Sequence, residues 1–449
     1  MVGRGGFFAL SFGSIVGSGW IVLLGEWLRL AAPAGALLAL LAGGMLMAAI
    51  GLCYAELAAR MPRAGAELRY VADTLGPKAA FPVGWFLTLF LVAICAFEGT
   101  ALPWLLGLLL PVRAVSLYRF LGEPVTGWGL SMGCLGAAAI CILNLGGVQL
   151  SVLFQRVITY AFLAVMVSLI IAGLTFGKLE NLQPAFSPPG GKSWLLGFTW
   201  LFGTCAMLLY GFQSALYLIE ERAPHVSVRA ATGSMVIGIV AAALFYAAVL
   251  LSAGSIIPWR SILSAELPSV AAFDALLPGR IAPVILVVAI FSLAKTWNAV
   301  IMMASRLVLA QAQAGLLPAW LGRIDARRKT PRNALLLVTG ASMIGIFLGR
   351  GAIVPIVNMA TICVSMTIAL MLLVLIVQRR RQPRSPGFSV PAPGLVIPVC
   401  TVGAVLMAGF ALFQPLWVQS GIPLEWKLIA LWAALGFIFR LAMRRRPRC

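Results

Sequence analysis

Three ionisable side chains lie within long apolar stretches of the sequence, where a charge is costly. They are Glu26, Glu98 and Lys295, and insertion scales put the cost of a charge at a bilayer centre at roughly 2.5–3.5 kcal/mol. Such residues usually face a water-filled cavity or a partner. Glu26 lies three residues before Arg29, so both are expected at an interface. Glu98 and Lys295 indicate function more strongly, and Asn298, one turn after Lys295, is expected to line the same cavity or to bond between helices.

Two apolar stretches carry more glycine than a continuous membrane helix needs. The first reads GSIVGSGW over residues 13–20, and the second reads GTCAMLLYGFQ over residues 203–213. Glycine lets a ligand approach the backbone closely, and paired interruptions at matching positions are typical of inverted-repeat transporters, whose site lies where half-helices end. Close helix packing explains one glycine-rich span equally well. Two such spans at matching positions favour functional breaks.

The rest of the chain must position these residues within a membrane. Of its 449 residues, 61% are hydrophobic and only 10% are charged, too apolar a composition for a soluble protein. A helix needs roughly 20 apolar residues to cross a bilayer core. We therefore predict an all-α polytopic membrane protein with about twelve helices, at 7–28, 34–55, 81–110, 130–147, 153–176, 194–218, 232–257, 282–305, 334–349, 353–377, 394–414 and 425–442.

The spans suggest a core and an accessory part. Spans 1 and 6 occupy matching positions in two five-helix halves, which predicts inverted repeats over about 7–176 and 194–377 within a ten-helix core at 1–378. Residues 379–393 (RRRQPRSPGFSVPAP) are basic and rich in proline, which predicts a non-helical cytoplasmic linker. Residues 394–449 then hold two accessory helices and a basic tail.

The basic residues behind the formal net charge of +20 are unevenly distributed among the loops. If the N-terminus is cytoplasmic, 23 of the 33 basic residues fall on the cytoplasmic side, nine on the other side, and Lys295 inside a span. This positive-inside bias predicts that both termini are cytoplasmic and that the chain crosses the cell (inner) membrane many times. No aromatic-interleaved basic patch accompanies the charge, so nucleic-acid binding is not expected.

Cysteine and histidine usage argues against an enzyme. The eight cysteines are scattered without a CxxC pair, and His225 is the single histidine. We therefore expect no disulfide, metal site, cofactor or catalytic residue. A membrane-embedded transferase needs clustered His, Asp or Glu, which this sequence lacks.

Four stretches, in order along the chain, resemble the amino acid–polyamine–organocation family. The resemblance covers essentially the whole chain and rests on IVGSG at 15–19, YAEL at 54–57 with MPRAG at 61–65, EERAP at 220–224, and SR at 305–306 with GLLP at 315–318 and TP at 330–331. It implies a five-plus-five inverted-repeat core and secondary active transport of amino acids or related amines by alternating access. The substrate-binding residues that it implies are Ile15, Val16, Gly17, Ser18, Gly19, Met207, Tyr210, Gly211 and Gln213.

A broken helix binds both charges of an amino acid without a charged side chain. Free N–H groups at the start of a half-helix attract anions, and unpaired C=O groups at the end of the other attract cations. We expect the N–H groups of Ser18 and Gly19 to hold a carboxylate and the C=O of Ile15 to face an ammonium group. The resemblance implies the C=O groups of Met207 and Tyr210 as further ammonium acceptors.

The coupling residues depart from the family pattern. Residues 155–160 (QRVITY) contain no lysine where some members have one in place of sodium. In this fold a cation ties span 1 to span 8, and Lys295 directly precedes Thr296 there. We predict that Lys295 acts as a surrogate cation on carbonyls near residues 14–16, with Glu98 as counter-charge, which makes transport sodium-independent and either proton-coupled or an exchange.

Other readings remain open. Glu56, Glu220 and Glu221 lie near the inner ends of spans 2 and 6, where pairing with Arg63, Arg222 or Arg306 is expected to form an inner gate or clamp. A polyamine or organocation transporter has the same features, a channel would favour polar rings over broken helices, and a non-transporting sensor is not excluded. The expected partners are a small-molecule substrate and the lipid bilayer, and the oligomeric state is open.

Overall fold

The computed structural model describes residues 1–110, 115–383, 387–417 and 421–444. Among the residues considered above, Cys449 and five basic residues lie outside these ranges, namely Arg113, Arg384, Arg445, Arg446 and Arg448. The described residues are almost entirely helical, with one short β-hairpin. The prediction of an all-α polytopic membrane protein is confirmed.

The first span is broken and then kinked. Helix α1 (Arg4–Ile15) is followed by the single turn α2 (Gly19–Val22), and α3 (Leu24–Arg60) contains the end of this span and the whole of the next. Ala32, with φ 56° and ψ 172°, interrupts α3 directly before Pro33. Because proline disfavours a helical residue before it, the kink falls between the two predicted spans.

The other elements of the first half include three long helices close to predicted spans. In chain order the elements are α4 (Ala66–Leu75), α5 (Pro77–Leu109), β1 (Ser116–Phe120), β2 (Glu123–Thr126), α6 (Gly127–Leu145) and α7 (Val148–Phe176), of which α5, α6 and α7 are the long helices. Strands β1 and β2 pair antiparallel. The hairpin and the short helix α4 were not predicted, because both lie between the spans that apolar length reveals.

The second half follows the same pattern. It contains α8 (Trp194–Leu208), α9 (Ser214–Tyr217), α10 (Val228–Ile256), α11 (Pro268–Asp274), α12 (Ile281–Gln313), α13 (Arg332–Ile346) and α14 (Ile353–Arg381), followed by α15 (Pro393–Phe413) and α16 (Leu424–Arg444). In the described part of the chain, ten segments are long and apolar enough to cross a membrane, and α8 and α13 are shorter apolar helices. The number of spans and the inverted-repeat division stay predictions.

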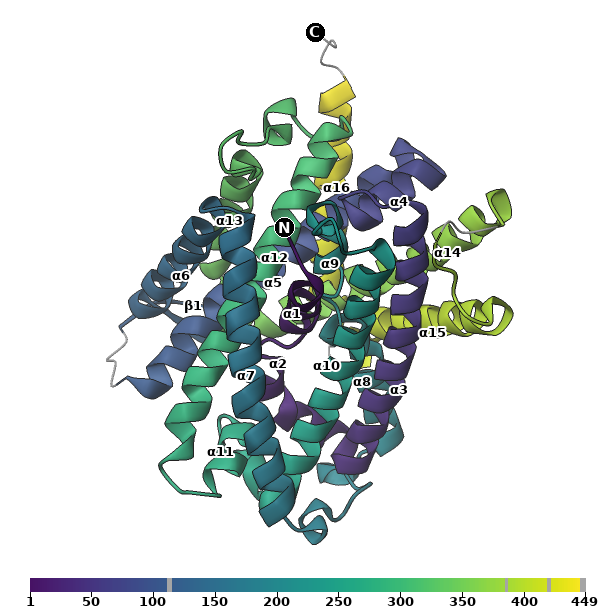
Figure 1. Cartoon of the computed structure of the whole chain (residues 1–449). Coiled ribbons are helices and arrows are strands. Elements are labelled where there is room, and N and C mark those ends of the chain that lie inside the picture. The colour runs from purple at the N-terminus through teal and green to yellow at the C-terminus, as the bar shows by residue number, and fades with distance from the viewer. Residues whose placement is uncertain (111–114, 384–386, 418–420, 445–449) are drawn as a thin grey trace.

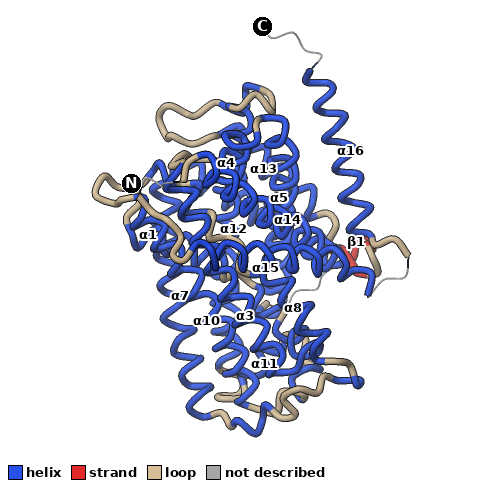
Figure 2. Tube along the Cα trace, turned by 90° about the vertical axis from the view of Figure 1, so that its right-hand side faces the viewer, coloured by secondary structure: helices blue, strands red, loops and turns tan. Residues whose placement is uncertain are grey.

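Helix α1 lies inside the bundle, in contact with α7, α10 and α12 (Figure 1). Helix α3 packs closely on α8 and α10. Glycine makes this approach possible, since a Cβ at Gly43 would lie 2.5 Å from the sulfur of Cys205, and one at Gly44 would lie 2.5 Å from the Cβ of Ala243. Helix α1 begins and α16 ends toward the same end of the bundle (Figures 1 and 2), hereafter the terminal end, whereas α11 lies toward the opposite end.

The last two helices pack on the outside of the bundle. Helix α16 is mostly exposed and is attached by Trp432, whose ring stacks on Trp85 of α5 at 4.7 Å between centroids. Each indole N–H donates to the other residue's carbonyl, at 2.9 and 3.1 Å. An aromatic pair with both N–H groups satisfied anchors a helix that otherwise faces lipid.

A buried carboxylate fixes the start of the linker. Glu56 of α3 is fully buried and forms ion pairs with Arg60 at 2.7 Å and Arg379 at 2.5 Å, and it accepts the N–H of Val390 at 2.8 Å. These partners differ from the loop arginines expected from the sequence, because α14 lies beside α3 here. The prediction that residues 379–393 lack helix is wrong for the first three, since α14 continues to Arg381 and the first proline follows it.

Candidate substrate site

The break in span 1 leaves backbone groups free. Helix α1 ends at Ile15, and Val16 (φ −88°, ψ 88°) is not helical. The N–H of Gly17 donates to the carbonyl of Ile15 at 3.1 Å, whereas the N–H groups of Ser18 and Gly19 donate to no acceptor in the described part of the chain. The predicted carboxylate-binding amides are therefore available at the start of α2.

The break in span 6 lies directly against the first. After α8 ends, Gly211 adopts φ 123°, a conformation that favours glycine. A Cβ at Gly211 would lie 2.8 Å from the carbonyl carbon of Ser14, and the Ser14 hydroxyl donates to that of Ser214 at 3.0 Å. Glycine is required here both by its backbone angle and by the close approach of the two broken spans.

Both breaks line one cavity of about 70 Å³. It contains nine of the predicted residues, which are Ile15, Gly17, Ser18, Gly19, Glu98, Met207, Tyr210, Gly211 and Thr296. The remaining wall is mainly apolar and includes Phe90, Ile94, Phe97, Leu208, Val300, Met303 and Val357. Apolar walls with a few convergent polar groups are typical of a small-molecule site.

Glu98 is the one carboxyl among the described residues that line this cavity. Its side chain is 2% exposed, and its Oε2 accepts the Ser18 hydroxyl at 3.4 Å. No ion pair within 4 Å joins it to Lys295, although both are described. The carbonyl of Ile15, predicted to face an ammonium, already accepts the hydroxyl of Tyr246 at 3.0 Å and the N–H of Gly17 at 3.1 Å, so both of its lone pairs are engaged.

Lys295 lies behind the break rather than in the cavity. Its ammonium group, fully buried, donates to the carbonyls of Gly13 (3.1 Å) and Val16 and lies 4.7 Å from the ring centre of Phe162. Two hydroxyls of α12 join the same carbonyls: that of Thr296 donates to Gly13 at 3.1 Å, and that of Ser292 donates to Val16 at 3.1 Å. Span 8 is thus bonded to the carbonyl end of α1 by three side chains.

Besides Lys295, three predicted site residues do not line the cavity. Val16 presents its carbonyl to Lys295 instead. Gln213 is buried and accepts the N–H of Gly211 at 3.0 Å, so it supports the break rather than meeting a ligand. Asn298 bonds to α6 and α7 instead of lining the cavity.

Asn298 belongs to a polar network between helices. It accepts from Asn144 of α6 at 2.9 Å and donates to the carbonyl of Ser151 and to Gln155 of α7, at 3.2 and 3.1 Å. Of the two roles expected for Asn298, bonding between helices is therefore the one observed. Asn298 follows Lys295 by three positions and is its neighbour on the surface of α12, but its amide meets α6 and α7, whereas the ammonium of Lys295 meets the end of α1.

Several residues at the site were not predicted. Ser292 precedes Thr296 by four residues, a spacing that places both on one helical face and would have found it. Tyr246, Phe90 and Phe162 are aromatic residues of apolar helices with no spacing that marks them as site residues, so only packing reveals them.

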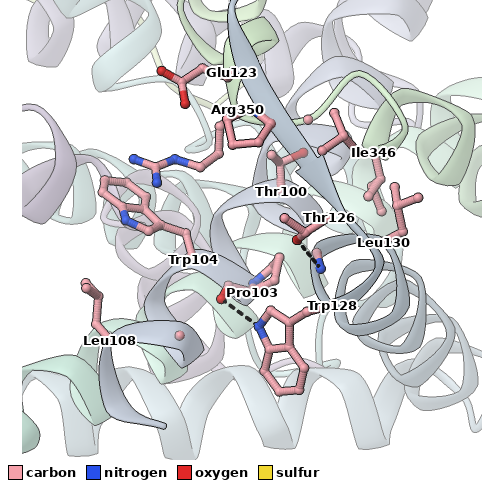
Figure 3. Close-up of a pocket in the computed structure, with 15 residues that line it drawn as sticks. Thr100, Pro103, Trp104, Leu108, Glu123, Thr126, Trp128, Leu130, Ile346 and Arg350 are labelled. Carbon is pink, nitrogen blue, oxygen red and sulfur yellow. Dashed lines mark hydrogen bonds between the residues drawn. The ribbon is translucent and has the colours of Figure 1, made fainter. Parts of the chain in front are cut away.

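A second, larger cavity of about 290 Å³ lies between α5, β2, the start of α6 and the loop after α13 (Figure 3). There the guanidinium of Arg350 lies over the ring of Trp104, 4.3 Å from its centre, and pairs with Glu266 at 3.6 Å. The Trp104 indole donates to Glu266 at 2.6 Å. This cavity shares no lining residue with the one at the breaks. Because its cation is already paired, we do not assign the substrate to it.

Two acidic residues at the terminal end bond to neighbouring segments. Glu221 forms the expected ion pair with Arg306 at 2.7 Å, and Glu220 accepts the N–H of Ala64 at 2.9 Å. Glu26 is exposed near the opposite end, as expected for an interface residue. Neither pair reaches the cavity at the breaks.

Two helices that are broken side by side around one apolar cavity, inside a bundle of membrane-crossing helices, define a broken-helix membrane transporter. The sequence profile of the amino acid permease family matches residues 6–439. The chain belongs to the amino acid permease family, and it is a multi-pass membrane transporter of amino acids or related compounds rather than an enzyme.

Individual relatives are distant but cover the whole chain. The chain is 26% identical to a methylthioribose transporter of Bacillus subtilis (strain 168), over 97% of this chain and 92% of that protein. It is 24% identical to the branched-chain amino acid permease BcaP of Lactococcus lactis subsp. cremoris, over 98% and 94%. It is 25% identical to cationic amino acid transporter 1 of Arabidopsis thaliana, over 92% and 70%. These names span several substrate classes, so the substrate must be argued from the cavity.

Proposed function

We propose that this protein is a sodium-independent secondary transporter that carries an amino acid with an apolar side chain across the cell membrane by alternating access. The observation that carries the proposal is the meeting of both helix breaks at one cavity. Free N–H groups of Ser18 and Gly19 enter it from span 1, and Tyr210 and Gly211 enter it from span 6. Backbone dipoles of opposite sign hold the carboxylate and the ammonium of the substrate.

The apolar walls of the cavity indicate which kind of side chain the substrate carries. Phenylalanine, isoleucine, valine and methionine side chains surround the cavity, and desolvating a polar or charged side chain against them costs free energy. Glu98 then faces the substrate ammonium or carries a proton. The relatives named for branched-chain amino acids agree with an apolar side chain.

The coupling proposal rests on Lys295. In the proposed cycle its ammonium group holds the carbonyl end of α1 against α12, the place where a bound cation would otherwise be needed. Transport then needs no sodium and proceeds by proton coupling or by exchange. Carbonyl oxygens that face one another at a helix end repel unless a cation lies between them.

The test is uptake by the purified protein in proteoliposomes. The substrates are radiolabelled L-leucine, L-arginine, putrescine and methylthioribose, each assayed with and without sodium, with and without a pH gradient, and with unlabelled substrate inside to detect exchange. We expect L-leucine to enter without sodium. Failure of every amino acid, with L-leucine also unable to raise the melting temperature, contradicts the proposed function. Sodium-dependent uptake contradicts the coupling proposal alone.

A transporter of cationic amines is the second candidate. A specific observation favours it, since the carboxyl of Glu98 lines the cavity without an ion pair to Lys295. A second ammonium or guanidinium group on the substrate would neutralise the carboxylate of Glu98. Faster uptake of putrescine or L-arginine than of L-leucine, abolished in Glu98→Gln, supports this candidate.

We also propose that the terminal end of the bundle faces the cytoplasm. The support is the distribution of basic residues, with 23 of 33 on the loops and termini of that side. Single cysteines at positions 327 and 385, the latter outside the described residues, should resist membrane-impermeant maleimide in intact cells. Labelling of either position before the cells are opened contradicts the orientation.

A further inference from the structure

A fully buried carboxyl lies outside the membrane-crossing helices. Glu67 is the second residue of the short helix α4 and is 0% exposed. Its Oε1 accepts the hydroxyl of Tyr210 at 3.3 Å, whereas its Oε2 has no hydrogen-bond partner in the described chain. Tyr210 belongs to the break in span 6, so α4 touches the substrate site through this carboxyl.

Tyrosine rings are the titratable groups that face Glu67. Four of them interact electrostatically with its carboxyl, namely Tyr54 of α3, Tyr70 of α4, Tyr210 and Tyr217. In the described part of the chain, the hydroxyls of Tyr54, Tyr70 and Tyr217 are buried with no partner within hydrogen-bond distance, although that of Tyr217, like that of Tyr210, favours the ionised form of Glu67. A carboxyl ringed by hydroxyls and aromatic carbon can donate or accept hydrogen bonds as a neutral acid, but as an anion it has little to neutralise it.

No basic side chain among the described residues forms an ion pair with Glu67. On α4 itself, Arg69 lines a neighbouring cavity and Asp73 is exposed, as is Lys78 at the start of α5. Burial therefore raises the pKa of Glu67 to about 7, partly opposed by the tyrosine hydroxyls. Of the other basic residues on the helices packed on α4, Arg380 is exposed and the rest bond elsewhere. These bonds join Arg306 to Glu221, Arg379 to Glu56, Arg381 to the carbonyl of Thr74, and Lys295 to the carbonyl of Gly13.

Glu67 lies between two cavities. On one side, Tyr210 lines the substrate cavity. On the other side, Tyr217 lines a cavity of about 160 Å³ at the terminal end, together with Arg69, Glu220 and Arg306. The two tyrosines flank the carboxyl, so a displacement of either ring changes whether Glu67 is dry or in contact with water.

We propose that Glu67 is a proton-binding site of the transport cycle. The carboxyl keeps its proton while Tyr210 and Tyr217 enclose it. When the terminal end opens and Tyr217 moves aside, the O–H bond breaks and the proton passes to water in the adjacent cavity, leaving a hydrated carboxylate. Closure reverses the step. The proposal rests on the proposed transport function and adds the proton as the ion that the cycle carries or senses.

The first test reads the carboxyl directly and needs no substrate. The purified protein is titrated from about pH 5 to about pH 9 while the infrared C=O stretch of protonated carboxyl groups is recorded in wild type, Glu67→Gln and the exposed control Glu180→Gln. We expect a band that disappears with a midpoint near 7, absent from Glu67→Gln and retained in Glu180→Gln. The same band in Glu67→Gln overturns the proposal.

A second variant keeps the test decisive if Glu67→Gln does not fold. Tyr210→Phe keeps the carboxyl but removes the hydrogen bond that favours its ionised form, so the midpoint should move to higher pH. An unmoved midpoint means that the band belongs to another group and overturns the assignment.

The second test measures transport. Exchange of L-leucine and L-arginine by proteoliposomes is compared at acid and alkaline pH. We expect several-fold pH dependence in the wild type and in Glu180→Gln, and a flat profile in Glu67→Gln. A wild-type profile in Glu67→Gln overturns the proposal. If the wild type carries neither amino acid, the proposed function fails, while the infrared titration still decides the state of Glu67.

Discussion

Replacing Lys295 by methionine removes a buried cation while preserving the length of the side chain. The ammonium of Lys295 donates to the carbonyls of Gly13 (3.1 Å) and Val16, and it lies over Phe162. Methionine fills the same space with an apolar thioether, so the packing of α12 on α1 is largely retained. The variant therefore isolates the charge from the volume of the side chain.

The expected effect on folding is small. Thr296 still donates to the carbonyl of Gly13. The Ser292 hydroxyl lies 3.1 Å from the carbonyl of Val16 and 3.0 Å from that of Gly17, so Val16 keeps a donor within reach. Losing hydrogen bonds from a charged donor is offset by no longer burying a charge that lacks an ion pair. We expect the free energy of unfolding to change by less than about 2 kcal/mol.

The expected effect on transport is much larger. A charged donor contributes roughly 1.5–3 kcal/mol per hydrogen bond, and the two bonds join elements that must separate or shift during alternating access. If half of this energy distinguishes the two conformations, the equilibrium moves by about 1.5–3 kcal/mol, which is roughly ten- to a hundredfold. L-leucine uptake should fall by about that factor.

The assay is initial uptake rate against pH in proteoliposomes. Wild type, Lys295→Met and the exposed control Lys178→Met are compared, with melting temperature measured on the same preparations. A Lys295→Met variant with wild-type rate and pH profile refutes the surrogate-cation reasoning. A variant that melts far below the wild type instead refutes the argument that Thr296 and Ser292 suffice to satisfy the carbonyls.

Three further predictions follow from individual contacts. A Cβ at Gly17 would lie 2.9 Å from the Thr296 hydroxyl, whereas one at Gly19 meets only ordinary contacts from 3.5 Å. Gly17→Ala should therefore lower both melting temperature and uptake, whereas Gly19→Ala should lose uptake alone; equal melting temperatures for the two refute this. Glu56→Gln leaves two arginines without their buried partner, so it should destabilise the protein by about 3 kcal/mol in a denaturant titration; an unchanged midpoint counts against the clamp. Asp274 accepts three backbone N–H groups at the start of α12, which hold its pKa below the usual value. Because the folded-state pKa is lowered, the ionised carboxylate stabilises the fold above the unfolded pKa of about 3.9, and this stabilisation is lost as pH falls through the folded value. Asp274→Asn should therefore have a lower melting temperature than wild type at neutral pH and the same melting temperature in strong acid.

Much of the architecture was predictable because it depends on local sequence. Apolar length alone located helices such as α7 and α10, since a backbone in lipid must satisfy its own hydrogen bonds. Glycine density located both breaks, because only glycine accepts φ 123° at Gly211 beside Ser14. The lysine at position 295 was recognisable because a charge in an apolar span needs a partner.

Other features depend on contacts between segments far apart in the chain. Glu56 and Arg379 are separated by 323 positions and meet only because α3 and α14 pack together. Glu67 carries no sequence signal, since an acid in a short polar helix usually faces water. Its burial under Tyr210 and Tyr217 arises from the fold of span 6 over α4.

The sequence by itself determined that this chain is a helical membrane transporter with two broken spans, because apolar length and glycine spacing act through the local backbone. Only the tertiary structure decided which side chains converge. It placed Asn298 in a network between helices, Gln213 beneath its own break and Glu67 beside the substrate cavity. The direction of a side chain on a helix follows from its position, but the neighbour that it meets is fixed only when the helices pack.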